Sequence, residues 1–291
     1  MNVDLSPSLD DFLIAPVEEV TKVAAATVIY ATGGTRRAVA LAGLSLSESY
    51  VKWSRPQMLE SFALIFRLGA QHLIAPAGRP QIFAEHGLYR EQFFTWMERG
   101  LTCSESLDYY RSSNWRVRLV VAGDTHPELT DIAATLEEAT STATGPNLWF
   151  LTTLDYNDLW SWIGTAFTNG ARTRAEAVRV LFGADIPPAK LLLSFGKPLV
   201  ALDHLPPLLF EEIQCYWTQR PGYSLTEHQL RTILYDHAYL RSTWRRDKTG
   251  RAEAALLHRT AWEHGPTLGL GMHLGPFWYP APIAPPTHLA N

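Results

Sequence analysis

The sequence Ala26-Thr-Val-Ile-Tyr-Ala-Thr-Gly-Gly-Thr-Arg-Arg-Ala38 joins an apolar run to a turn with two glycines and two arginines. The run over residues 26–31 is typical of a buried strand. Glycines let backbone N–H groups approach a ligand closely, and guanidinium groups bind phosphate oxygens. The pattern is neither the Walker loop nor the dinucleotide fingerprint, and such turns also occur without a ligand. The stretch predicts a strand followed by a candidate phosphate site.

Further apolar runs follow at regular distances and predict strands over residues 71–76, 115–123, 147–154, 190–195 and 211–217. Helical spacing of apolar residues predicts helices between them, over residues 56–69, 86–100, 104–112, 128–140, 158–170 and 173–183. Strands that alternate with helices indicate an α/β fold whose mostly parallel central sheet is covered by helices. Ligands of such sheets bind at the carboxyl ends of the strands, where the Gly-Gly turn lies.

The last third of the chain changes character. Ser224 and Glu227 match a capping box, which predicts a long helix to about residue 246. A second helix is expected over about residues 252–264. The tail that follows is rich in proline and glycine, which excludes a regular helix. No internal repeat and no linker between domains is evident.

Composition limits the possible partners. The chain has 291 residues and a net charge of −4, so its overall charge favours neither nucleic acid nor an anionic membrane surface. Cys103 and Cys215 lie too far apart for a zinc motif and form no disulfide framework. No secretory signal and no run of roughly 20 apolar residues is present. We therefore expect a cytoplasmic protein without stable membrane insertion.

The order of these motifs resembles the cis-prenyltransferase fold, that of undecaprenyl diphosphate synthase. The match covers about residues 26–246 and includes the runs over residues 117–124, 147–151 and 191–196. Within that superfamily the chain is most similar to the bacterial branch of tuberculosinol synthase, also called tuberculosinyl adenosine transferase, with kolavelool synthase as a plausible relative. The similarity to this branch rests on Gly34-Thr-Arg-Arg37, Tyr50 and Leu230-Arg-Thr-Ile-Leu-Tyr-Asp-His-Ala-Tyr-Leu-Arg241.

The chain departs from the family at two places. The family turn begins with an Asp that helps to bind magnesium and the allylic diphosphate, and Gly33 stands there in this chain. Chain-elongating members also hold a second diphosphate with arginines and a serine, and Ser194, His228 and Leu230 align with those points. The resemblance therefore implies one diphosphate site and ionisation of a single substrate.

The implied reaction releases diphosphate from a bicyclic diterpenyl diphosphate of the labdane, clerodane or halimane type, made by a separate class II cyclase. Capture of water gives a diterpene alcohol such as kolavelool or tuberculosinol. The resemblance assigns the diphosphate to Gly33, Gly34, Thr35, Arg36 and Arg37 and the reaction to Arg36, Arg37 and Tyr50. Because tyrosine is a poor base at pH 7, Tyr50 is expected to orient the water while diphosphate accepts the proton.

Magnesium is expected to be weakly required or dispensable because the usual ligand is absent. Asp155 and Asp158 are weak substitute ligands, and Asp158 is better explained as a helix N-cap. Two alternatives stay open: transfer of a diterpenyl group to a nucleoside or another small acceptor, and a non-catalytic subunit of the cis-prenyltransferase type. The resemblance further implies a homodimer, and it divides the chain into an N-terminal extension (1–25), one catalytic domain (26–265) and a tail (266–291).

Overall fold

The computed structural model describes residues 6–44, 48–123, 126–196, 200–201, 207–241, 249–265, 268–275 and 277–280. The chain forms two compact units, Met1–Ala238 and Tyr239–Asn291. We describe each unit by itself. The first contains the large sheet and the candidate site.

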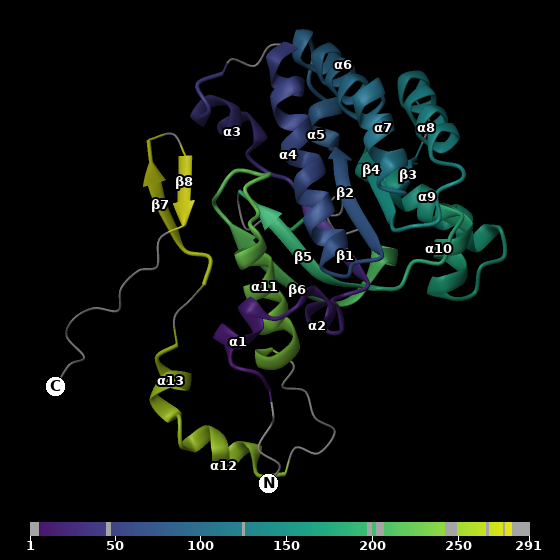
Figure 1. The fold of residues 1–291 in the computed structure, drawn as a ribbon. Coiled ribbons are helices and arrows are strands. Elements are labelled where there is room, and N and C mark those ends of the chain that lie inside the picture. The colour runs from purple at the N-terminus through teal and green to yellow at the C-terminus, as the bar shows by residue number, and fades with distance from the viewer. Residues whose placement is uncertain are drawn as a thin grey trace. The chain divides into compact units, whose positions relative to one another are not determined.

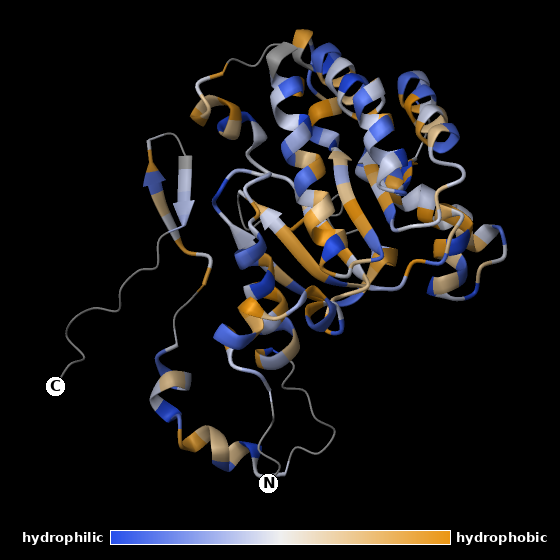
Figure 2. Ribbon diagram, in the orientation of Figure 1, coloured by the Kyte–Doolittle hydropathy of each residue, from blue (hydrophilic) through white to orange (hydrophobic). Residues whose placement is uncertain are grey.

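Six parallel strands form the central sheet of the first unit, in the order β3-β4-β2-β1-β5-β6 (Figure 1). The strands are β1 (Thr27–Ala31), β2 (His72–Gly78), β3 (Arg116–Ala122), β4 (Asn147–Thr153), β5 (Ala189–Phe195) and β6 (Phe210–Thr218). All six predicted strands and the parallel arrangement are confirmed. Apolar residues are concentrated on the central strands (Figure 2), as expected for a sheet that is buried on both faces.

Helices follow the strands along the chain and cover the sheet. They are α1 (Leu9–Ile14), α2 (Val17–Thr21), α3 (Thr35–Leu41), α4 (Glu48–Arg67), α5 (Pro80–Phe83), α6 (Leu88–Leu101), α7 (Ser104–Ser112), α8 (Pro127–Ala139), α9 (Tyr156–Thr168), α10 (Arg174–Phe182) and α11 (Glu227–Tyr235). A short 3-10 turn, η1 (Pro207–Leu209), precedes β6, and a π-helical turn, η2 (Asp236–Leu240), continues α11.

Alternation along the strands divides the core into two layers. Phe62 of α4 contacts Tyr30 and Phe150, with ring centroids 5.8 and 6.1 Å apart. The preceding residue of β4, Trp149, points to the opposite face and contacts Phe182 of α10, with ring centroids 5.8 Å apart. Because neighbouring strand residues face opposite sides, one sheet carries both layers.

Two helix starts differ from the sequence prediction. Helix α4 begins at Glu48, so Pro56 lies inside it rather than at its first turn. The Gln57 side-chain amide donates to the Trp53 carbonyl at 2.8 Å in this turn, and buried Val51 packs the earlier turn into the core. Helix α11 is capped by Thr226 in a capping box with Gln229, two residues later than the predicted box of Ser224 and Glu227. Tertiary packing thus overrides the local signal in α4.

The N-terminal segment is fastened to α11 by Arg231. This guanidinium is only 7% exposed and donates to the carbonyls of Ala15 at 2.7 Å and Phe12 at 3.4 Å. It also pairs with Glu227 at 2.8 Å. Positive charge at the carboxyl end of α1 meets carbonyls that lack helical partners. The segment before β1 is therefore part of the packed unit.

We expect Arg231→Met to cost about 1.5–3 kcal/mol, the range for hydrogen bonds that involve a charged group. Urea unfolding would give this loss, and limited proteolysis would show faster cleavage within residues 6–25. The control is Arg67→Met, because Arg67 pairs with the same Glu227 but is 56% exposed, where an ion pair contributes about 0–1 kcal/mol. Equal losses in the two variants would contradict the assignment.

His72 occupies the opposite, amino edge of the sheet, at the start of β2. Trp149 Nε1 donates to His72 Nδ1 at 3.3 Å, and the two rings stack at 6.4 Å. Arg118 lies 4.7 Å above the Trp149 ring. Burial, and then the charge of Arg118, lower the pKa of His72. The folded state therefore favours the neutral form of the His72 imidazole.

This arrangement predicts a pH-dependent stability. A histidine with a lowered folded-state pKa contributes its stability above about pH 6.5, its unfolded value, and that stability is lost as the pH falls further through the folded pKa. Urea unfolding at pH 7.5 and 5.5 should show a steeper loss for the natural chain than for His72→Gln. Exposed His228→Gln is the control. Identical slopes in the natural chain and His72→Gln would refute the prediction.

The second unit contains short elements. Two helices, α12 (Arg251–Leu256) and α13 (Arg259–Glu263), replace the single helix predicted over residues 252–264. Neither has a buried residue, and an unsupported helix of this length is marginal. β7 (Gly271–Leu274) and β8 (Phe277–Pro280) form an antiparallel hairpin in the tail, which the sequence reasoning missed. Residues 266–267, 276 and 281–291 of the tail lie outside the described ranges. No described helix is long and apolar enough to cross a membrane.

Candidate active site

Four glycines bring three segments together at the carboxyl ends of β1 and β5. A Cβ on Gly33 would lie 1.8 Å from the Phe195 carbonyl oxygen. Gly222, from the loop after β6, donates its N–H to the Gly33 carbonyl at 2.7 Å. Gly34 and Gly196 have left-handed backbones, with φ of +71° and +97°. We call Gly33, Gly34, Gly196 and Gly222 the glycine cradle. It confirms the predicted turn at the carboxyl end of β1.

Arg37 and Arg36 occupy different surroundings. A Cβ on Gly34 would lie 2.6 Å from Arg37 Nη2, and one on Gly196 would lie 3.4 Å from the same atom, so the Arg37 guanidinium lies over the cradle. Arg37 is half-buried and makes no hydrogen bond or ion pair with the described part of the chain. Arg36 is exposed, and Thr35 opens α3. The positive charge of Arg37 at the cradle is therefore not paired with a carboxylate of the described chain.

Three tyrosines gather beside the cradle. Tyr223 interacts with Thr32 and lies close enough to Tyr50 and Tyr30 for electrostatic coupling. Burial raises the pKa of Tyr30 to about 12, and that of Tyr223 further still. Tyr50, from the first turn of α4, contacts Trp96 of α6 with ring centroids 5.1 Å apart. The structure thus brings Tyr50 close to Tyr223, whose neighbour Gly222 belongs to the cradle.

The residues aligned with the second diphosphate site offer no cation. Ser194 is 6% exposed within β5, and Leu230 is 2% exposed within α11. His228 is exposed on α11. None of these side chains supplies the fixed positive charge that a diphosphate requires.

The substitute metal ligands lie at the start of α9. Asp155, rather than the predicted Asp158, caps this helix and accepts from the Asn157 N–H at 2.6 Å. Asp158 packs on Gly123, where an added Cβ would meet the Asp158 Cβ at 2.3 Å. In the described ranges no group of three or more His, Cys, Asp and Glu side chains could hold a metal ion. At the turn itself, Gly33 has no room for the usual carboxylate.

Two residues near the cradle were missed by the sequence reasoning. Arg79 directly follows β2, the neighbour of β1, so it lies at the same edge of the sheet. The available signal was a basic residue three positions after the strand predicted over residues 71–76. Tyr223 comes from the loop after β6, and nothing in the local sequence places it beside Tyr50.

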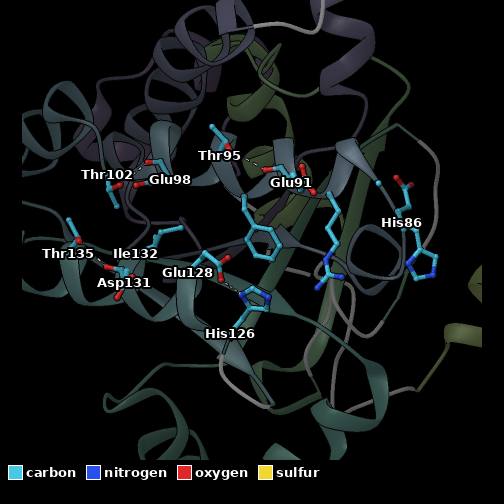
Figure 3. Close-up of a pocket in the computed structure, with 14 residues that line it drawn as sticks. His86, Glu91, Thr95, Glu98, Thr102, His126, Glu128, Asp131, Ile132 and Thr135 are labelled. Atoms are coloured by element: carbon cyan, nitrogen blue, oxygen red, sulfur yellow. Dashed lines mark hydrogen bonds and ion pairs between the residues drawn. The ribbon is translucent and has the colours of Figure 1, made fainter.

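A cavity of about 520 Å³ lies elsewhere, between α6 and α8 (Figure 3). His126 there pairs with Glu128 and stacks on Phe94, with ring centroids 4.7 Å apart. Five carboxylates and one arginine belong to its lining: Glu85, Glu91, Glu98, Glu128, Asp131 and Arg90. Such a lining repels diphosphate and does not suit a hydrocarbon. We therefore do not assign the substrate to this cavity.

A group of aromatic residues on α5, α6 and α4 forms a more suitable hydrocarbon surface. Phe83 contacts Phe93 and Phe94 at 5.7 and 5.6 Å, and Trp96 continues the series toward Tyr50. Phe93, Phe94 and Trp96 are half-buried on α6. By contrast Met58, Phe62 and Ile65 of α4 are core residues, at most 9% exposed. Partly covered aromatic faces can contact both a hydrocarbon and a cation.

Comparison with known proteins agrees with this geometry. No family model matches the chain. It is 46% identical over 280 residues to (+)-kolavelool synthase of Herpetosiphon aurantiacus, covering 94% of this chain and 96% of that protein. A shorter match, 36% over 69 residues, covers 24% of this chain and 23% of tuberculosinyl adenosine transferase of Mycobacterium tuberculosis.

Solved structures show the fold. Lavandulyl diphosphate synthase from Lavandula x intermedia superposes with a TM-score of 0.59 at 16% identity, covering 75% of this chain and 97% of that one. A probable undecaprenyl diphosphate synthase from Campylobacter jejuni gives 0.55 at 14% identity, covering 74% and 95%. The chain therefore belongs to the (+)-kolavelool synthase family, diterpene synthases built on the cis-prenyltransferase fold.

Proposed function

We propose that this protein ionises a bicyclic diterpenyl diphosphate at the glycine cradle and adds water to the resulting cation, giving a diterpene alcohol. The near full-length similarity to (+)-kolavelool synthase carries this proposal. The unneutralised Arg37 guanidinium over Gly34 and Gly196 supports it, since diphosphate is an anion of matching geometry. A separate class II cyclase makes the substrate, because the proposed chemistry here begins from a completed ring system.

The chemistry follows from where charge develops. When the bond between the allylic carbon and oxygen breaks, its electron pair stays on diphosphate. Arg37 stabilises that growing negative charge where it forms, and this lowers the barrier. The faces of Tyr50 and Trp96 lie beside the carbon side and can stabilise the cation. The hydrocarbon rings rest on the aromatic residues of α6.

Water then donates a lone pair to the cation and forms the new C–O bond. The excess proton passes to the released diphosphate, since a neutral tyrosine near pKa 10 is a poor base at pH 7. Tyr50 orients the water through its hydroxyl. Loss of a proton from carbon instead of water capture would give a hydrocarbon, so the position of the water decides the product.

Incubation of the purified protein with several bicyclic diterpenyl diphosphates in isotope-labelled water tests the proposal, with geranylgeranyl diphosphate as the acyclic control. An alcohol that carries the solvent label is expected. Adenosine is added in a second arm, because the shorter match is to a transferase named for adenosine. A prenylated adenosine in place of the alcohol would favour transfer, and no turnover with any substrate would refute both reactions.

Magnesium should be weakly required or dispensable, because no described donor set fits the ion and Arg37 already supplies positive charge. Turnover with a chelator should stay within about threefold of turnover with added magnesium. Magnesium bound by the diphosphate itself accounts for a residual effect of that size. Complete loss of activity in chelator, restored by magnesium, would contradict this part of the proposal.

The proposal includes a homodimer formed through β6 and α11. β6 is one of the two edge strands of the described sheet, the other being β3, and an edge strand leaves backbone groups for pairing with another chain. Light scattering after size exclusion would show twice the chain mass. A monomer at micromolar concentration would exclude it.

A further inference from the structure

The loop that joins β6 to α11 holds a tyrosine in an unusual backbone conformation. Tyr223 has φ of +71°, in the left-handed region that a bulky side chain rarely adopts. Such a residue costs about 1–3 kcal/mol and persists only where its surroundings fix it. Here the preceding Gly222 is held by its N–H bond to the Gly33 carbonyl at 2.7 Å. The loop is therefore fastened to the cradle with Tyr223 at its tip.

Close packing at this point leaves little freedom. A Cβ on Gly222 would lie 3.1 Å from the Gly33 carbonyl oxygen and 3.2 Å from Thr32 Cβ. The end of β1 and the loop thus touch at residues directly beside Tyr223. The left-handed conformation turns the Tyr223 side chain back toward Thr32, with which it interacts.

Tyr223 also interacts with the two other tyrosines, Tyr30 and Tyr50. Its backbone faces the Tyr30 hydroxyl, and the side chain couples to Tyr50. Tyr50 is braced in turn by the Trp96 ring at 5.1 Å. Burial raises the pKa of Tyr223 above its usual value, so it stays neutral and can both donate and accept a hydrogen bond. Tyr223 thus interacts with the Thr32 side chain and is electrostatically coupled to Tyr50.

We infer that Tyr223 is a positioning residue that sets where Tyr50 holds the water for capture of the diterpenyl cation. This inference rests on the proposed function and adds to it the control of product identity. Tyr223 takes no proton and forms no bond to the substrate. It fixes the Tyr50 hydroxyl, so that water reaches the cationic carbon before the released diphosphate removes a proton from an adjacent carbon. When the water is misplaced, the cation loses a proton instead, and the product is a hydrocarbon.

The experiment compares Tyr223→Phe with the natural protein in isotope-labelled water and measures two quantities, diphosphate release and the ratio of alcohol to hydrocarbon. Loss of a positioning hydrogen bond should lower the ratio about five- to tenfold while release changes less than about threefold. A merely structural residue would slow release and leave the ratio unchanged. Tyr110→Phe is the matched control, since this fully buried tyrosine lies on α7 in the core.

Thr32→Val provides an independent test that keeps Tyr223 in place and removes the hydroxyl with which it interacts. The ratio should move in the same direction by a smaller factor, even where Tyr223→Phe does not fold. An unchanged ratio in both variants, with the natural protein active, overturns the inference alone. An inactive natural protein overturns the proposed function and this inference together.

Discussion

Arg37→Met is expected to lower kcat about 100- to 1,000-fold, the loss found when one preorganised donor to a developing oxyanion is removed. Arg37 lies over Gly34 and Gly196 and has no hydrogen-bond or ion-pair partner in the described chain. Its charge is thus available to the leaving group. Arg37→Lys should recover only part of the rate, because a single ammonium cannot reproduce the planar fork of donors.

Arg36→Gln is the matched control for Arg37, because it removes the neighbouring charge from an exposed side chain. Its kcat should stay within about fivefold, the effect of a screened charge outside the cradle. Thermal unfolding completes the test: Arg37→Met should keep or raise the melting temperature, since no folded-state bond within the described residues is lost. Equal activity losses at both positions would show that the two arginines share the diphosphate.

Gly33→Ala is expected to destabilise the fold by at least about 2 kcal/mol and to abolish turnover, since overpacking of this kind costs about 1–3 kcal/mol or more. The new methyl group would stand 1.8 Å from the Phe195 carbonyl oxygen, a backbone atom that cannot rotate away. β1 and β5 would have to separate at the cradle. Urea unfolding and steady-state turnover measure the two effects.

Gly33→Asp extends the test to the metal. It returns the residue type found in the family's magnesium site, yet its Cβ meets the same carbonyl, so it should neither raise activity nor create magnesium dependence. The control is Gly164→Ala on α9. An added Cβ there would have no atom within 4 Å beyond the backbone of its own helix. The substitution should therefore add about 0.5–1 kcal/mol of helix stability. An active, magnesium-dependent Gly33→Asp enzyme would contradict this description of the cradle.

Local sequence was sufficient for the sheet because buried parallel strands are continuous apolar runs between turn residues. The same reasoning located the Gly-Gly turn at the carboxyl end of β1. It misplaced the start of α4, since a proline normally marks a first turn and here lies inside a packed helix. The sequence reasoning also predicted one helix where the structure has two, α12 and α13. Their apolar residues have helical spacing, but none of these residues is buried.

The sequence predicted only part of the candidate site, and the reason is different. Arg36 and Arg37 are adjacent in sequence and chemically identical, and only packing over the cradle separates their environments. Tyr223 lies 173 positions after Tyr50, and their proximity depends on the loop fastened to Gly33. Roles that arise from contacts between distant segments have no local signature.

The cradle also bears on how this branch could change over evolutionary time. Because the Phe195 carbonyl and the Gly222 loop fill the space beside Gly33, regaining a carboxylate there requires prior movement of two other segments. Each single step passes through a protein with a disrupted cradle. A carboxylate at residue 33 therefore cannot be introduced by a single substitution without disrupting the cradle. A laboratory route back would have to redesign residues 33, 195–196 and 222 together.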